Sequence, residues 1–329
     1  MNELTTSRTY VLILPLMMLG LAALACADES PLQPPAEVPH QERWGIYALE
    51  LELQAVELIY SSPDEITSLR LNAAGDRFVI SQQVDGEGYE FSEIFTLGIH
   101  GQDRRRLTEN EFWDLYPAWS SDGTQILFLS WREDDLDLYV MNADGSNPER
   151  FFDSGTHDAD VDWVGDRVVF TSGNRIWIMH DDATGAEPVT DPPQAGEWGN
   201  ANLPYGDYDP RLSPDGAQVA FERMVDVSAA HGSYDLFVVD IDGANLKRLT
   251  NSGYSQGFPN WSHDGSLIVY VVAAIEDVGQ FDLYLMNNDG SNDRNITPSW
   301  FPPEFLCHTA VFSADDEVVY FIGEWWEAD

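Results

Sequence analysis

One unit recurs along this chain, and it constrains the fold more than any other feature. Its clearest copy, Tyr116 to Asn147, has an apolar run ending at Trp119, an Asp-Gly turn, two further apolar runs (125–130 and 137–142) and a second Asp-Gly. Residues 126–129 are apolar on both alternating faces, so this strand is expected to be covered on both sides. Asp-Gly between apolar runs predicts hairpins with type I′ turns, in which both central residues have positive φ.

The other copies follow the same punctuation. We call the residue that ends the first apolar run the anchor position; it falls at Leu71, Trp119, Trp163, Leu212, Trp261 and Phe312. Successive anchors are therefore 48, 44, 49, 49 and 51 residues apart. A repeat of this length with about four strands per unit is typical of a β-propeller blade.

The sixth copy is incomplete, because its second half is missing after the strand that contains residues 318–322. The missing half is found near the other end of the chain. Residues 45–49 resemble the third strand of a unit, and residues 56–60 fit the edge strand that follows it. The sequence therefore predicts an all-β, six-bladed β-propeller whose last blade is closed by N-terminal strands.

The repeat resembles that of the TolB-type (WD-like repeat) β-propeller family. The resemblance is carried by PAWSSDGTQILFLS with DLYVMNADGSN, by PRLSPDGAQVAFER with DLFVVDIDGANLKRLT, and by PNWSHDGSLIVYVV with DLYLMNNDGSN, and it covers about residues 44–329. It implies a module that binds proteins in the bacterial cell envelope. TolB is similar to a propeller preceded by a separate α/β domain, which is not expected before Trp44 here, so TolB's partner contacts are not carried over. Related propellers also occur in peptidases and lyases, so the fold alone does not choose a function.

The amino-terminal segment is read as a targeting sequence. Residues 1–25 have Arg8, an apolar stretch and small residues before Cys26, as a signal peptide does. The sequence Ala23-Leu24-Ala25-Cys26 resembles a lipobox, which predicts lipidation of Cys26; the alternative is an ordinary signal cut near Ala25 or Ala27. Residues 26–43 are expected to be a flexible, Pro-rich linker, and 44–329 the propeller. The expected location is the cell envelope, periplasm or outer membrane, with a lipid anchor.

Charge narrows the range of partners. The chain has 57 Asp and Glu against 16 Lys and Arg, a formal net charge of −41. This charge excludes nucleic acid phosphates and anionic lipid heads as natural partners. We therefore expect contact with the membrane only through the lipid anchor, and a monomer that binds an envelope protein or a glycan.

Familiar catalytic motifs do not occur in the sequence. It contains no Gly-x-Ser-x-Gly, His-Glu-x-x-His, Gly-rich phosphate loop or Cys-x-x-Cys. The predicted function is therefore a non-enzymatic binding or scaffold module. The alternative is a metal-dependent, polysaccharide lyase-like or glycan-binding propeller, in which His157 and His308 would be the catalytic candidates.

The repeat phase predicts one constellation of polar residues. The segments at the start of each inner strand should meet at one mouth of the central channel. They carry Asp114, Tyr116, His157, Asp158, Asp160, Asp207, Tyr208, Asp209 and His308. Carboxylates that converge there can bind Ca²⁺, with Asp160 and Asp209 as ligands, or a cationic segment of a partner. The alternative is that these acids are solvated loop residues or strand caps.

Overall fold

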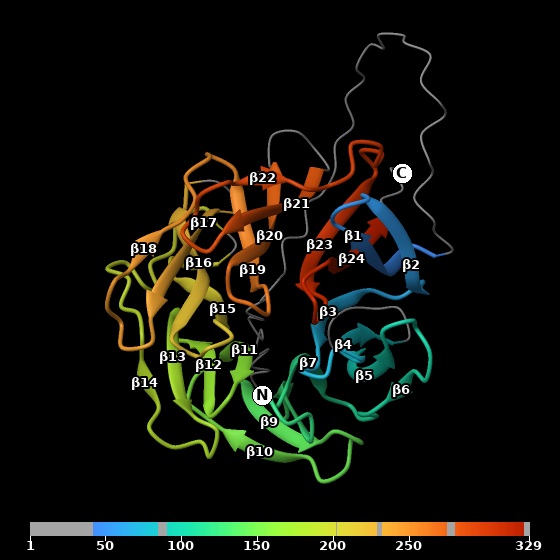
Figure 1. The fold of residues 1–329 in the computed structure, drawn as a ribbon. Coiled ribbons are helices and arrows are strands. Elements are labelled where there is room, and N and C mark those ends of the chain that lie inside the picture. The colour runs from blue at the N-terminus through green and yellow to red at the C-terminus, as the bar shows by residue number, and fades with distance from the viewer. Residues whose placement is uncertain (1–41, 85–90, 202, 229–231, 275–279, 326–329) are drawn as a thin grey trace, which may run out of the picture.

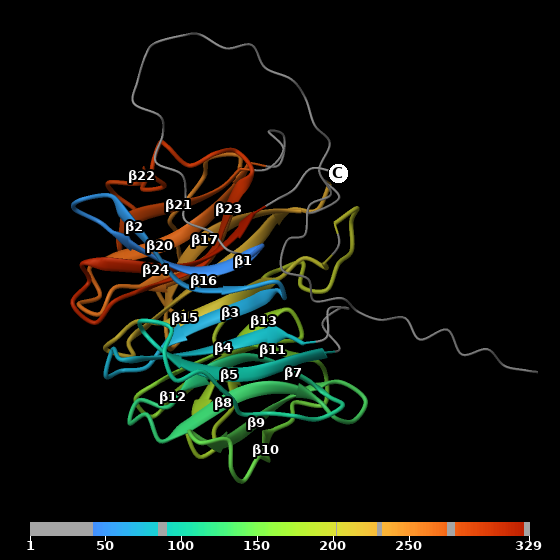
Figure 2. The same cartoon turned by 90° about the vertical axis from the view of Figure 1, so that its right-hand side faces the viewer.

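The computed structural model describes residues 42–84, 91–201, 203–228, 232–274 and 280–325, without the side chains of 274 and 280. These residues form six four-stranded antiparallel sheets, which stand as blades around a central channel (Figure 1). Seen from the side, the blades form one thick ring (Figure 2). The described residues contain no helix, and hence none long and apolar enough to cross a membrane. The predicted all-β, six-bladed propeller is confirmed.

The blades are numbered along the chain, and their strands are given from the channel outward. Blade one is β3 (Ile66–Leu71), β4 (Arg77–Gln83), β5 (Ser92–Gly98) and β6 (Arg105–Arg106); blade two is β7 (Trp113–Trp119), β8 (Gln125–Trp131), β9 (Leu136–Asn142) and β10 (Glu149–Phe152); blade three is β11 (Asp158–Val164), β12 (Arg167–Ser172), β13 (Arg175–His180) and β14 (Glu187–Pro188). Blade four is β15 (Asp207–Leu212), β16 (Gln218–Asp226), β17 (Ser233–Asp240) and β18 (Lys247–Arg248); blade five is β19 (Ser255–Trp261), β20 (Leu267–Ala274), β21 (Gln280–Asn287) and β22 (Arg294–Asn295); blade six is β23 (Phe305–Phe312), β24 (Val318–Trp325), β1 (Trp44–Glu50) and β2 (Ala55–Ser62).

Blade six joins the two ends of the described chain. Strand β1 pairs along its whole length with β24, from Trp44 opposite Glu324 to Glu50 opposite Val318. The Arg43 guanidinium adds an ion pair to Glu324 at 2.6 Å. The closure predicted from the incomplete sixth copy is confirmed, and it leaves β24 without an open edge.

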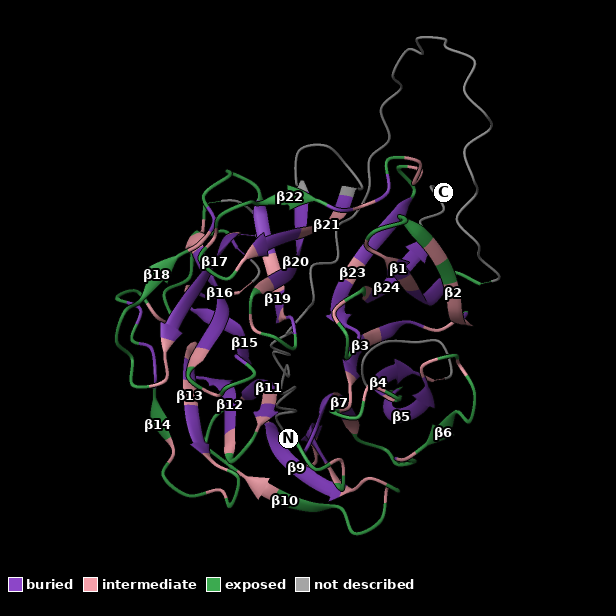
Figure 3. Cartoon of the chain, in the orientation of Figure 1, coloured by how far each residue is buried: buried purple, intermediate pink, exposed green. Residues whose placement is uncertain are grey.

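The apolar residues of each middle strand serve two neighbouring blades. Ile126, Leu127, Phe128 and Leu129 of β8 are all fully buried. Leu127 and Leu129 pack toward blade three, whereas Ile126 and Phe128 pack toward blade one. Because β8 packs against a blade on each side, its residues are apolar on both faces, as the sequence predicted. Figure 3 shows the inner and middle strands buried and the edge strands exposed.

The hairpins form where predicted, but the predicted turn type is wrong. Gly123 donates its N–H to Ser120 O, so the turn runs from Ser120 to Gly123 and the glycine is its last residue. Gly123 has a φ of 70°, whereas Asp122 does not have positive φ. The Asp122 carboxylate instead accepts the Ser120 hydroxyl at 2.8 Å and the Thr124 N–H at 2.9 Å. The loop is thus longer than a two-residue type I′ turn, and the aspartate is needed as an acceptor.

The threonine that follows Leu, Val or Ile at the end of several units has a definite role. In four blades the threonine hydroxyl accepts a backbone N–H of the third strand, at 2.7 to 3.0 Å. The pairs are Thr108 with Ile94, Thr190 with Ile176, Thr250 with Leu236 and Thr297 with Leu283. This bond satisfies a buried donor where the two-residue edge strand has already ended.

The predicted signal peptide, Cys26 and most of the predicted linker lie outside the described residues, and their assignments stay predictions.

Candidate functional site: the central channel

Each of the six inner strands is interrupted at the same place. The register with the second strand shifts between Leu115 and Ala118 in β7, and the equivalent shift occurs in β3, β11, β15, β19 and β23. In four blades the bulged residue has positive φ: Tyr116, Asp160, Asp209 and Phe258 lie between 47° and 55°. Non-glycine residues adopt this conformation at a cost, so the surroundings must hold it.

Neighbouring blades supply the contacts that hold these bulges. The bulge N–H of Asp209 donates to the Asp160 carboxylate at 3.3 Å, across the boundary between blades four and three. The Phe258 N–H donates likewise to the Glu222 carboxylate of blade four, also at 3.3 Å. Bulge and neighbouring blade therefore stabilise each other.

Three of the channel side chains are carboxyl groups that influence one another. Burial raises the pKa of Asp160 and raises that of Asp209 well above its usual value. Burial, with the charge of Asp160, raises the pKa of Glu222 to about 8. Arg70 of blade one opposes this by lowering the pKa of Asp160 and Asp209. Because like charges in a buried site cannot all ionise, the group holds protons near neutral pH.

The structure therefore brings Asp160 and Asp209 together, and it adds Glu222, which the sequence reasoning missed. Glu222 lies in β16, the second strand of blade four, whereas the residues predicted from the repeat phase stand at the starts of inner strands. Among the described residues, no three His, Cys, Asp or Glu side chains are grouped so as to hold a metal ion. Ca²⁺ binding by Asp160 and Asp209 stays a prediction.

Asp114, Asp158 and Asp207 occupy the equivalent first positions, but each is fully buried and bonded within its own blade. Ser130 Oγ donates to Asp114 at 2.5 Å, and Arg223 binds Asp207 through two nitrogens at 2.5 and 2.7 Å. Asp158 accepts the Ser154 hydroxyl at 2.6 Å, and burial raises its pKa to about 7. These contacts are those of strand caps, and a binding role at the channel mouth stays a prediction for the three residues.

Tyr116 and Tyr208 make hydrogen bonds to a neighbouring blade or to the loop before their strand. Tyr116 is half-buried, and its N–H donates to Ser81 Oγ of blade one at 3.4 Å. The Tyr208 hydroxyl donates to Pro204 O at 2.6 Å and accepts from Asn174 at 2.9 Å.

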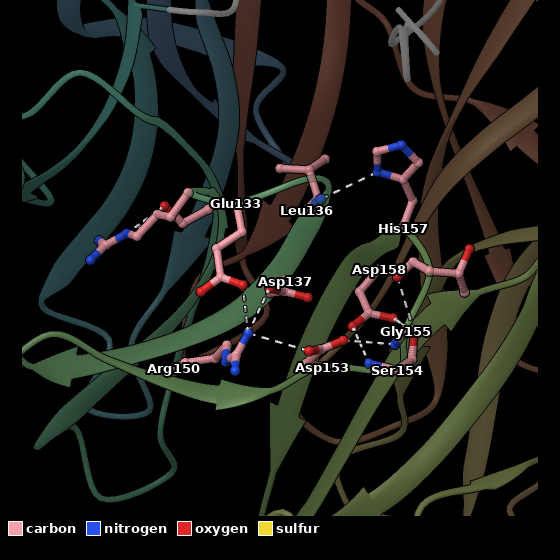
Figure 4. Close-up of polar contacts among 12 residues, drawn as sticks. Glu133, Leu136, Asp137, Arg150, Asp153, Ser154, Gly155, His157 and Asp158 are labelled. Carbon is pink, nitrogen blue, oxygen red and sulfur yellow. Dashed lines mark hydrogen bonds and ion pairs between the residues drawn. The ribbon is translucent and has the colours of Figure 1, made fainter.

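His157 Nδ1 accepts the Leu136 N–H at 3.2 Å, and burial lowers the pKa of this histidine (Figure 4). The same view shows Arg150 between Asp137 and Asp153, a separate charged group. His308 lies three blades away, 3.1 Å from Glu324 and against Trp44. The two histidines thus do not meet.

A second feature lies at the opposite end of the channel, where the inner strands end. A hollow of about 320 Å³ is lined there by residues of all six blades. Its wall contains the six anchor residues, Leu71, Trp119, Trp163, Leu212, Trp261 and Phe312, and the six residues before them, Arg70, Ala118, Asp162, Arg211, Asn260 and Val311. Exposed Ala73, Ser121 and His263 stand at its rim, so it opens to solvent.

The sequence also contains a signal for this hollow. The anchors established the period, and the same phase places every preceding residue at one level of the ring. Two of those six residues are arginines in a strongly acidic chain, which singles them out.

Comparison with known proteins places this fold. No protein-family model matches the sequence. An uncharacterized protein of Agrobacterium fabrum is 28% identical over 211 residues, which are 60% of this chain and 66% of that protein. A protein TolB homolog of Chlorobium luteolum is 28% identical over 156 residues, 46% of this chain and 32% of that protein. A putative TolB structure from Agrobacterium tumefaciens superposes with a TM-score of 0.65 at 16% identity, covering 87% of this chain and 99% of that one.

This chain has the β-propeller fold of the putative TolB structure. The statement concerns the fold, because the match spans only about a third of the TolB homolog. The propeller itself is matched almost completely by the putative TolB structure. What TolB proteins do as whole molecules enters below as a proposal.

Proposed function

We propose that this TolB-type propeller is an exported, lipid-anchored module of the bacterial cell envelope that binds another envelope protein without catalysis. The names of the relatives support the general role, since they include a TolB homolog and a Tol-Pal system protein TolB. The targeting segment with Cys26 supports export and the anchor. Because the match covers only part of the TolB proteins, the binding partner of this chain is not inferred from theirs and has to be identified by experiment.

The observation that carries the proposal is a set of exposed aromatic side chains at one end of the channel. Phe112, Trp198 and Tyr254 are 38%, 60% and 48% exposed. They stand in the loops that precede the inner strands of blades two, four and five, so the topology places them at the same end. Exposed aromatic residues that share one face are the usual anchors of a protein interface.

The arrangement of the histidines supports binding over catalysis. In the lyase alternative His157 and His308 are the catalytic candidates, so they would have to act together at this end of the channel. His157 and His308 instead belong to opposite sides of the six-blade ring, and each contacts residues beside it. We therefore propose binding as the function and keep turnover of acidic polysaccharides as a measurement to be made beside it.

The test is capture of a partner from envelope extract with the mature chain as bait. A specific partner should be retained by the parent and lost when Trp198 and Tyr254 are both changed to alanine. Leu53→Ala is the matched control, because Leu53 is 69% exposed but lies in the β1–β2 turn at the other end of blade six. Equal capture by the parent and the double variant would reject this face as the binding surface.

A further inference from the structure

The hollow at the end of the inner strands contains an unusual number of buried donors without an acceptor. Arg70 Nε, Arg211 Nε, Trp119 Nε1, Trp163 Nε1 and Asn260 Nδ2 are all buried and make no hydrogen bond among the described residues. All five belong to residues that line this one hollow. They come from five different blades, so the ring symmetry gathers them rather than any local turn.

Buried donors of this kind are costly. Each unsatisfied N–H loses its bond to water and gains nothing in exchange. Native proteins keep very few such groups, and five in one hollow call for a common acceptor. Each of these side chains is at least nine-tenths buried, with exposed fractions from 4% to 9%.

The two arginines indicate that this acceptor is negatively charged. They occupy the same repeat position in blades one and four, on opposite sides of the six-blade ring. Each places Nη1 on the carbonyl of the residue before it, Arg70 at 2.8 Å and Arg211 at 2.6 Å. The Nε atom of each arginine makes no hydrogen bond, so the two sides of the hollow offer equivalent donors.

Acidic groups of the chain neutralise this pair only in part. Arg211 Nη2 lies 3.4 Å from Asp209. Arg70 makes no ion pair with any carboxylate that the structure describes, although Asp162, Asp160 and Asp209 act on it from a longer distance. Asp162 also lines the hollow, where one of its oxygens accepts the Leu212 N–H at 2.9 Å. A buried guanidinium that lacks a close ion-pair partner favours binding of an anion.

The walls add a second requirement. The aromatic rings of Trp119, Trp163, Trp261 and Phe312 surround the donors, so the hollow offers apolar faces as well as N–H groups. Trp261 differs from the other two tryptophans, because its Nε1 already donates to Arg211 O at 3.1 Å. About 320 Å³ is the size of a small-ligand site.

We propose that this hollow binds a small organic molecule that carries a carboxylate. The carboxylate accepts from Arg70 and Arg211. Other oxygens of the molecule accept from Trp119, Trp163 and Asn260, and the carbon skeleton of the molecule contacts the rings. Acidic sugars and open-chain polycarboxylates share this chemistry. The site lies at the opposite end of the channel from the aromatic protein-binding face, so it stands whether or not a protein partner is found.

The experiment is titration calorimetry and thermal unfolding of the full chain with D-glucuronate and with citrate, at constant ionic strength. D-Glucose is the neutral control. At least one of the two carboxylates should bind and raise the melting temperature, while glucose should do neither. Binding of glucuronate alone would identify an acidic sugar, and binding of citrate alone an open-chain acid. The absence of binding by both, or equal binding of glucose, would overturn the proposal.

Two variants locate the site. Trp163→Phe and Trp119→Phe each keep an aromatic ring and remove one donor, and each should weaken binding by about tenfold, as expected for a hydrogen bond to a charged group. Trp177→Phe is the matched control, since Trp177 Nε1 donates to Ser172 O away from the hollow. If the Trp163→Phe and Trp119→Phe variants both bound as tightly as the parent, the ligand would lie outside the hollow and the proposal would be wrong. Two variants are used so that poor folding of one leaves the other to decide.

Discussion

Asp160 of blade three accepts the backbone N–H of Asp209 in blade four at 3.3 Å, and both residues are themselves strained bulge residues with positive φ. The side chain of one bulge residue, Asp160, thus stabilises the bulge of the next blade at Asp209. The cost is that two carboxyl groups, with Glu222 as a third, share a buried site. This relationship makes the channel sensitive to pH.

Glu222→Gln is expected to remove part of that sensitivity. The folded state holds the Glu222 proton up to a pKa of about 8, whereas the ordinary value is 4.5. Between these values folding binds a proton, so the free energy of unfolding falls as pH rises and the loss is complete above the folded pKa. Glutamine is neutral throughout and keeps an acceptor for the Phe258 N–H. The free energy of unfolding of the variant should be higher than the parent's by a few kcal/mol at pH 8 and about equal at pH 4.5, because each unit of pKa shift corresponds to about 1.4 kcal/mol.

Urea unfolding at pH 4.5, 6 and 8 measures this effect. Asp160 and Asp209 have pKa values raised in the same direction, so a smaller slope should persist in the variant. Glu133→Gln, at an exposed carboxyl, is the control. An unchanged pH slope in Glu222→Gln would show that this carboxyl does not titrate as described.

The Ca²⁺ prediction for Asp160 and Asp209 can be tested on the same channel. A divalent ion that binds only the folded state raises the free energy of unfolding by about 2.7 kcal/mol when its concentration is 100 times Kd, and the melting temperature rises accordingly. Calorimetry with Ca²⁺, Mg²⁺ and Mn²⁺ should show this rise in the parent, and Asp160→Asn combined with Asp209→Asn should abolish it. Asp114→Asn, at a carboxyl bonded to Ser130 within blade two, should retain the rise. No rise with any ion in the parent would reject the prediction.

Closure of blade six should make the amino-terminal strands essential. Ile46 is fully buried and stands opposite Ile322 of β24. Ile46→Asn places an amide among apolar side chains and should lower the free energy of unfolding by about 3–5 kcal/mol. Leu53→Asn, at a side chain that is 69% exposed, should change it by less than about 0.5 kcal/mol.

Deletion of residues 44–60 is the stronger form of the same test. It removes β1 and most of β2, exposes the edge of β24, and should cause aggregation or loss of cooperative unfolding. A soluble deletion variant with the parent's melting transition would contradict the closed ring.

Lipidation should depend on the sulfur of Cys26 alone. Cys26→Ser is expected to release the protein from the membrane fraction and to remove the mass of the acyl chains. Mass spectrometry and fractionation of the expressed full chain measure both. Membrane association and mass that match the parent's would point to the alternative, an ordinary secretory signal.

The repeat pattern was sufficient to predict the fold in detail because each unit carries its own punctuation. Asp122, the paired apolar faces of β8 and the threonines after the edge strands are local signals, and each acts within one blade or on its neighbour. The turn type was mispredicted for a related reason. The preference of Asp-Gly for type I′ turns is statistical, whereas here the Asp122 carboxylate caps a longer loop.

The sequence by itself therefore determined the number of blades, their strands and the closure at Trp44–Glu50, since these follow from local pattern and period. Only the tertiary structure decided what each channel residue does. Asp158 and Asp160 are two residues apart in one strand, yet the first is bonded to Ser154 and the second to the next blade. Arg70 and Arg211 are far apart in sequence, and only ring closure brings them to opposite sides of one hollow. The physical reason is that burial, pairing and charge in the channel depend on contacts between blades, which no single repeat contains.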